Sequence, residues 1–311
     1  MTGLSSAVAA NQSTLVQYIE IWVPDDDGQT MRLMDHSRLG GSVVDSGKSE
    51  RHVCSGEGVA GMAWTQRSAV ILQESPSELL QRIGIQNGLD LTALIAYPII
   101  RGHDVLSVVV FGISDGPGAF EIWSRDDRDE LSISSSYYSG LRSLEFISRY
   151  VKFPKGAGLP GNVWQSGQPN LAADLTNNLT FMRSCEADET VLQTGLALPV
   201  GSAAGNSDSV LLMLSAEQTP IANAIELWAP NSTTESAVEF QCVASDGHSK
   251  NEDWIVREAW TTGSPVLWSS QSSPASDTGA TKKATLAMPV YRGPKQVSVV
   301  VFVFRYLGTA N

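Results

Sequence analysis

The chain repeats one pattern of residues three times along its length. Each copy begins around a Glu-Ile-Trp or Glu-Leu-Trp core, within segments 19–37, 120–138 and 225–245. In each segment an apolar and aromatic run, a polar turn and a second run predict a β-hairpin. A helix-like stretch with an aligned tryptophan follows, and then two aliphatic strands are joined by a turn. Three units of about 100 residues, called units one, two and three, therefore fill the chain.

A glycine motif stands in the middle of units one and two. In unit two, Gly156, Gly158 and Gly161 have the spacing G-x-G-x-x-G, which also marks dinucleotide-binding loops. Such a loop must follow a buried parallel strand and open a long crossover helix. Here Gly167 and Pro169 limit the predicted helix to about Leu159–Gln165, which is too short for a crossover. We therefore expect the glycines to turn the chain from a sheet into a short helix, with Gly161 lying close to a neighbouring element.

The overall composition favours small globular domains and excludes several classes of partner. The 311 residues carry a formal net charge of −12, which argues against nucleic acid and anionic membrane surfaces. No apolar run is long enough to span a bilayer, and the first residues lack the basic start of a secretory signal, so a cytoplasmic protein is expected. The length and the repeat predict domains at 1–115, 116–218 and 219–311.

Unit two resembles a GAF domain. The resemblance rests on "GAGLPGNVWQSGQPNLAADL", on the later "GLALPVGS" and on the order of the predicted elements, and it spans nearly all of 118–215. Unit one matches with "GEGVAGMAW" and "IAYPIIRG", whereas unit three keeps the order of elements but not the glycines. The resemblance implies three consecutive GAF-like domains, the third degenerate. It also implies an α+β fold in each, with a central antiparallel sheet and short helices packed on it.

Motifs for catalysis and metal binding are weak, so we expect no enzymatic activity and no metal site. Ser114 lies in a G-x-S-x-G sequence, but another strand follows instead of the helix that a nucleophile elbow needs. The four histidines are scattered without zinc-ligand spacing. Cys54, Cys185 and Cys242 stand at non-equivalent places of the repeat, which argues against a shared redox role. No cofactor can be named from the sequence.

The hypothesis for function is a small-molecule sensor, with the ligand in unit two between the sheet and segment 174–194. That segment supplies a cation, acids and an aromatic side chain, as a ligand site needs. The candidate ligand-binding residues are Trp164, Asp174, Phe181, Arg183 and Cys185.

Each part of this hypothesis has a structural alternative. Trp164 is expected to be a core residue, Asp174 is expected to cap a turn, and segment 174–194 can equally be a solvated helix. In unit one the corresponding segment, 74–90, predicts a packed helix, and in unit three segment 269–283 predicts a mobile loop. Output is expected through a partner protein or self-association. The alternative function is a ligand-free interaction scaffold, and an enzyme is the third choice.

Overall fold

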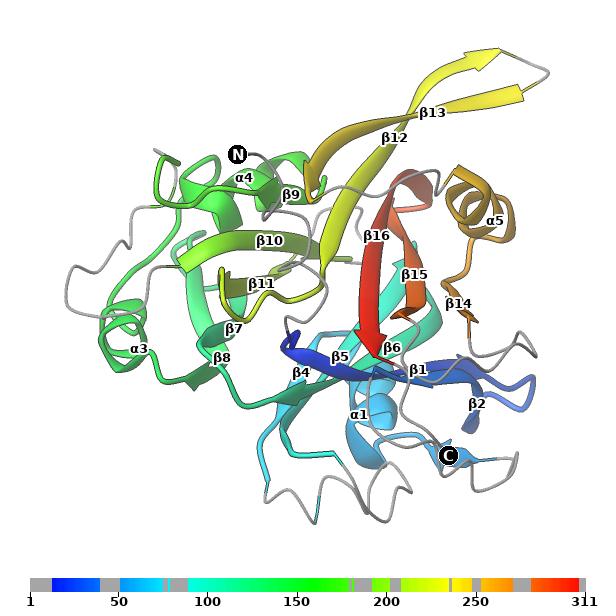
Figure 1. Cartoon of the computed structure of the whole chain (residues 1–311), viewed down its shortest axis with the longest axis horizontal. Coiled ribbons are helices and arrows are strands. Elements are labelled where there is room, and N and C mark those ends of the chain that lie inside the picture. The colour runs from blue at the N-terminus through cyan, green and yellow to red at the C-terminus, as the bar shows by residue number, and fades with distance from the viewer. Residues whose placement is uncertain are drawn as a thin grey trace, which may run out of the picture.

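A computed structural model describes residues 13–39, 51–74, 78, 89–178, 181, 192–201, 208–234, 237–247, 253–270 and 281–307. Within them the chain forms three antiparallel sheets, here called sheets A, B and C (Figure 1). Sheet A contains β1 (Val16–Pro24), β2 (Thr30–Arg38), β3 (His52–Cys54), β4 (Val70–Leu72), β5 (Leu91–Arg101) and β6 (Asp104–Ser114). Sheet B contains β7 (Gly118–Arg125), β8 (Leu131–Ser139), β9 (Asn170–Ala172), β10 (Leu192–Val200) and β11 (Ser209–Ala216). Sheet C contains β12 (Ala224–Thr234), β13 (Ala237–Asp246), β14 (Val266–Ser269), β15 (Thr281–Arg292) and β16 (Lys295–Leu307).

The three sheets share one strand order. Sheet B runs β8-β7-β11-β10-β9 and sheet C runs β13-β12-β16-β15-β14. Sheet A runs β3-β2-β1-β6-β5-β4, which is the same order with β3 added at the edge. In each sheet the first hairpin therefore pairs with the last strand, so the pattern that recurs in the sequence also recurs in the pairing. The predicted domain boundaries remain a prediction.

Short helices accompany the sheets: α1 (Gly58–Gln66), α3 (Arg142–Ser148), α4 (Gly158–Ser166) and α5 (Asp253–Thr262). Helix α4 confirms the short helix predicted after the glycines. It ends at Gly167, which adopts a left-handed φ of 65° and donates its N–H to the carbonyl of Val163. Helix α1 ends at Arg67, which also adopts a left-handed φ, of 54°, although this residue is not a glycine. No helix within the described ranges is long and apolar enough to cross a bilayer.

The predicted α+β class is wrong. Strands make up 56% of the described residues and helices 16%, so the fold is dominated by its three antiparallel sheets. The physical reason is local: each helix is stopped after two or three turns, whereas the β-branched and aliphatic runs continue as strands of up to 13 residues. The predicted helix at 74–90 and the predicted loop at 269–283 lie mostly outside the described residues.

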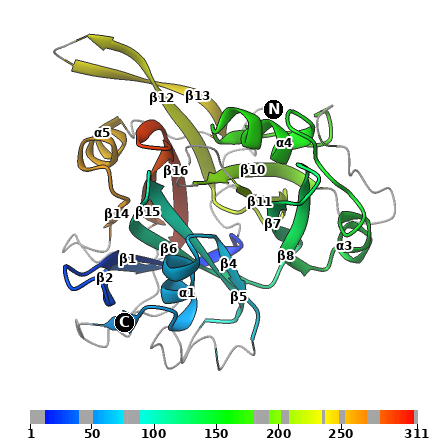
Figure 2. The same cartoon turned by 180° about the vertical axis from the view of Figure 1, so that it is seen from behind.

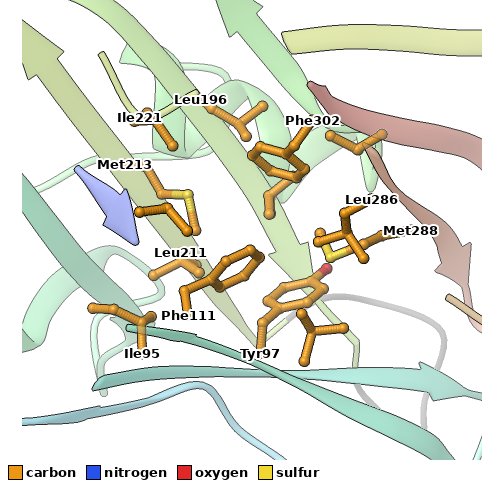
Figure 3. Packing of buried hydrophobic residues seen from close by; sticks show 14 of the residues in the cluster. Ile95, Tyr97, Phe111, Leu196, Leu211, Met213, Ile221, Leu286, Met288 and Phe302 are labelled. Atoms are coloured by element: carbon orange, nitrogen blue, oxygen red, sulfur yellow. The ribbon is translucent and has the colours of Figure 1, made fainter. Parts of the chain in front are cut away.

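One face of every sheet contributes to a common apolar core. Side chains from all three sheets meet there, and Figure 3 shows Phe111 of sheet A, Met213 of sheet B and Phe302 of sheet C among them. The opposite face of each sheet carries its own smaller apolar cluster. These clusters lie beneath α1, α4 and α5, the helices that Figure 2 shows beside the sheets. Each unit therefore builds a cluster of its own, but the largest core belongs to the three sheets together.

The edges of the sheets also meet, so that the three sheets close into a ring. Strand β4 lies beside β8, β9 beside β13, and β14 beside β2. Hydrogen bonds also join the sheets, for example from the Tyr97 hydroxyl of β5 to the Pro199 carbonyl of β10 at 2.7 Å and from the Thr194 hydroxyl of β10 to Asp246 of β13 at 2.6 Å. The ring therefore couples the three units through both apolar and polar contacts.

Candidate functional site

The glycines of unit two form a tight turn that leads into α4. Gly156 and Gly158 have φ values of 80° and 62°, which other residues adopt at a cost. A Cβ added to Gly161 would lie 2.3 Å from the carbonyl oxygen of Pro154, so only glycine fits there. The Gly156 N–H closes the turn on the Gly161 carbonyl at 2.9 Å. The structural role predicted for these glycines is confirmed, and unit one repeats it.

Trp164 is a core residue, as its structural alternative predicted. Its side chain is only 5% exposed and belongs to the apolar cluster under α4, together with Leu159 and Val163. The Lys155 ammonium group lies 4.7 Å from the centre of its ring, where the ring face attracts a cation. The aligned tryptophans, Trp64 and Trp260, are half-buried against the corresponding clusters.

Asp174 caps a turn just after β9. Its carboxylate accepts hydrogen bonds from the backbone N–H and hydroxyl of Thr176 and from the backbone and side-chain nitrogens of Asn177. The hydrogen bonds from Thr176, followed by those from Asn177, hold the pKa of this carboxyl below its usual range. The local role is therefore present, and it occupies both carboxylate oxygens.

The remaining candidate residues are only partly placed. Phe181 packs, partly buried, against the apolar cluster under α4, and its backbone N–H donates to the carbonyl of Asn178 at 3.0 Å. Arg183 and Cys185 lie outside the described residues. The structure thus brings Trp164 and Phe181 to one cluster on the α4 face of sheet B, and Asp174 lies on the loop that follows β9. A ligand role for these residues remains a prediction.

A buried glutamate on the first strand of every sheet was missed by sequence reasoning. Glu20, Glu121 and Glu226 are 2%, 0% and 4% exposed. Each accepts a hydrogen bond from the indole of the tryptophan two residues later, at 2.8, 2.9 and 2.8 Å respectively. The sequence signal for this pair is the Glu-x-Trp recurrence itself. Residues two apart on a strand point to the same side, so the pair could have been inferred.

In unit two, Glu121 joins three elements on the α4 face of sheet B. Besides the Trp123 indole, its carboxylate accepts hydrogen bonds from the Tyr138 hydroxyl of β8 at 2.6 Å and from the Ser148 hydroxyl of α3 at 3.0 Å. A buried carboxylate needs such donors, because burial without them would be costly. Glu121 therefore provides a fixed polar group beside an apolar cluster.

In unit one, the corresponding carboxylate holds an arginine. Arg51 forms an ion pair with Glu20 at 2.8 Å and lies 5.7 Å from the centre of the Trp22 ring. The Tyr18 hydroxyl also donates to Glu20 at 2.8 Å, and burial, followed by the charge of Glu20, raises the pKa of Tyr18 far above its usual value. An internal guanidinium thus fills the position beside the carboxylate in unit one.

The residues that the sequence offered for catalysis or metal binding have structural roles or are not grouped with one another. Ser114 ends β6 and its hydroxyl donates to the carbonyl of Leu15, with β7 starting at Gly118 instead of a helix. Cys54 is exposed and Cys242 is half-buried, and both are free thiols. Burial, with a smaller effect from Glu226, raises the pKa of Cys242. Within the described ranges, no three His, Cys, Asp or Glu side chains are grouped to hold a metal ion.

Comparisons with known proteins give limited similarity. No family model and no curated protein matches the chain. Among solved structures, the nlh2 GAF domain of A. aeolicus matches with 24% identity over 32% of this chain and 57% of its own, at a TM-score of 0.26. Free methionine-R-sulfoxide reductase from Neisseria meningitidis matches with 17% identity over 33% of this chain and 53% of its own, at a TM-score of 0.25. A NreA protein from Staphylococcus aureus, mutated in its nitrate binding site, matches with 20% identity over 34% of this chain and 80% of its own, at a TM-score of 0.26. The chain thus spans little more than half the length of the first two.

Proposed function

We propose that this is a cytoplasmic, non-catalytic regulatory protein that binds a small molecule on the α4 face of sheet B. In this proposal, ligand binding shifts the ring of sheets, and this structural change is transmitted to a partner protein. The domain kind proposed for unit two is a GAF-like sensor, in line with its sequence motifs.

The position of Phe181 is the observation that carries the proposal. This aromatic residue belongs to segment 174–194, and it packs partly buried against the cluster that contains Leu159 and Trp164. The hydrogen-bonded carboxylate of Glu121 lies on the same face of the sheet. Small-molecule sites typically combine a mostly apolar lining with a few fixed polar groups, and this face offers both.

The common core links the proposed ligand site to the other two units, as transmission to a partner requires. Residues Leu196 and Leu198 of β10 belong to the core shared with sheets A and C, while Ala197 between them belongs to the cluster on the α4 face. Thr194, on the same strand, bonds to Asp246 of unit three. A displacement of β10 by a ligand would therefore also shift residues in the other two units, because packed cores transmit strain.

Native mass spectrometry of the purified full chain tests the proposal. A co-purifying small molecule is expected, and Phe181→Ala and Arg183→Ala should each weaken its retention. Phe146→Ala is the matched control, because Phe146 lies on α3 and is 62% exposed. Equal retention by Phe181→Ala and the control, or a wild-type protein that binds no molecule from a metabolite library, would defeat the proposal.

A ligand-free interaction scaffold is the second candidate, and exposed aromatic side chains favour it. On α3 and just after it, Phe146 and Tyr150 are 62% and 74% exposed and contact each other edge to face. In unit three, Trp254 and Trp268 form a similar pair and are 46% and 39% exposed. Such residues are enriched where proteins bind proteins. The scaffold is favoured if no small molecule binds while Phe146→Ala or Trp254→Ala abolishes binding of a defined partner.

A further inference from the structure

Basic side chains gather where units one and three meet. The turn between β5 and β6 carries Arg101, and the turn between β15 and β16 carries Arg292 and Lys295. The two turns touch, because the Gly102 N–H donates to the Gly293 carbonyl at 2.8 Å.

Further contacts place two of these cations and add a fourth. Arg67, at the end of α1, donates from its guanidinium to the carbonyl of Gly102 at 3.5 Å. Arg292 reaches the end of α4, since a Cβ added to Gly167 would lie 3.0 Å from its side chain. Burial raises the pKa of the Tyr291 hydroxyl, and the charge of Arg101 is close enough to oppose this rise. The four residues Arg67, Arg101, Arg292 and Lys295 are called the basic seam.

The four cations of the basic seam lie close to one another without acidic partners in the part of the chain that the structure describes. Among the described residues, none of its four members forms an ion pair, and Asp104 is the acid on the two touching turns. Several other cations pair locally, as Arg125 does with Asp129 and Arg149 with Glu145. A chain with a net charge of −12 thus leaves a group of cations uncompensated at one place.

We propose that the basic seam is the docking surface for an acidic segment of a partner protein. Three of its four cations are exposed on tight turns that are fixed to each other, so little ordering is needed on binding. Charge complementarity then selects an exposed run of Asp and Glu. A nucleic acid fits less well, because the acidic turns at Asp25–Asp27 and Asp126–Asp129 and the overall charge would repel a long polyanion.

The ligand proposal rests on Phe181 and Glu121 and this one on the basic seam, so either proposal can fail without the other. Its contribution is mainly electrostatic, and exposed ion pairs are individually weak and screened by salt. We therefore expect binding that is readily reversible and that weakens as the salt concentration rises.

Fluorescence anisotropy with the full chain and a labelled decaglutamate peptide tests the proposal. We expect binding at low salt that weakens at least about tenfold in Arg101→Glu/Arg292→Glu, because two attractions become repulsions. Arg101→Gln/Arg292→Gln should give a smaller loss, and it covers the case in which charge reversal prevents folding. The matched control is Arg142→Glu/Arg149→Glu, which makes the same change in charge on exposed residues around α3.

Selective loss in the seam variants supports the proposal. An equal loss in the control would show that only overall charge matters, and it would overturn the proposal. So would failure of the wild-type protein to bind decaglutamate, or tighter binding of a single-stranded oligodeoxythymidine at the same salt concentration.

Discussion

Replacing Glu121 with alanine should be among the most damaging single changes in unit two. The carboxylate is 0% exposed and accepts hydrogen bonds from at least Trp123, Tyr138 and Ser148. Glu121→Ala removes the acceptor but leaves these donors buried or half-buried. The substitution also opens a cavity between β7, β8 and α3.

The magnitude follows from the number of bonds that are lost. A hydrogen bond to a charged group contributes about 1.5–3 kcal/mol, but the variant also escapes the desolvation cost of the buried carboxylate. Leaving a buried donor without an acceptor costs about 1–3 kcal/mol, so three such donors, less the relieved desolvation of the carboxylate, give an expected loss of about 3–5 kcal/mol of unfolding free energy. Glu121→Gln keeps the shape, and its amide group can donate to the two hydroxyls while its oxygen accepts from the indole. Its loss should be only about 1–2 kcal/mol.

Chemical unfolding by guanidinium, followed by circular dichroism and tryptophan fluorescence, measures both variants. The slope of the transition should stay constant, so that the shift of the midpoint reports stability. Glu145→Ala is the control, since its pair with Arg149 lies on the surface of α3 and should contribute at most about 0.5 kcal/mol. A loss below about 1 kcal/mol for Glu121→Ala, or equal losses for the alanine and glutamine variants, would refute the reasoning.

Further outcomes follow from the same structure. Trp164→Ala should cost about 3–5 kcal/mol in a denaturant melt, and a loss under about 1 kcal/mol would mean that the ring is not part of the core. Gly161→Ala should lower the thermal midpoint sharply, because its Cβ would lie 2.3 Å from the Pro154 carbonyl, and an unchanged midpoint would contradict this geometry. A hydrogen bond from Lys152 lowers the pKa of Asp126 from 3.8 to about 2. The resulting stabilisation is present above pH 3.8 and is lost as the pH falls toward 2, so Asp126→Asn should make the acid melts less pH-dependent in that window. Because the three sheets share one core, calorimetry should show one cooperative unfolding transition, and three separate transitions would disprove the coupling.

The candidate site was only partly predictable from the sequence. The burial of Trp164 and the capping role of Asp174 followed from their immediate neighbours, and both are seen. The buried carboxylate of Glu121 was not predicted, because a glutamate on a hairpin strand is usually exposed, and its donors Tyr138 and Ser148 come from other elements. Its exposure depends on which face of the strand α3 and α4 cover.

The sequence by itself determined the features that depend on neighbouring residues. The hairpins, the glycine turn before α4 and the end of that helix at Gly167 follow from alternation, backbone freedom and stop signals within a few residues. The tertiary structure alone decided that strands would outweigh helices and that the three sheets would close around one core. Phe111 and Phe302 are far apart in the sequence but lie 5.7 Å apart between ring centres. Such contacts arise from the burial of whole sheet faces, which local residue patterns do not specify.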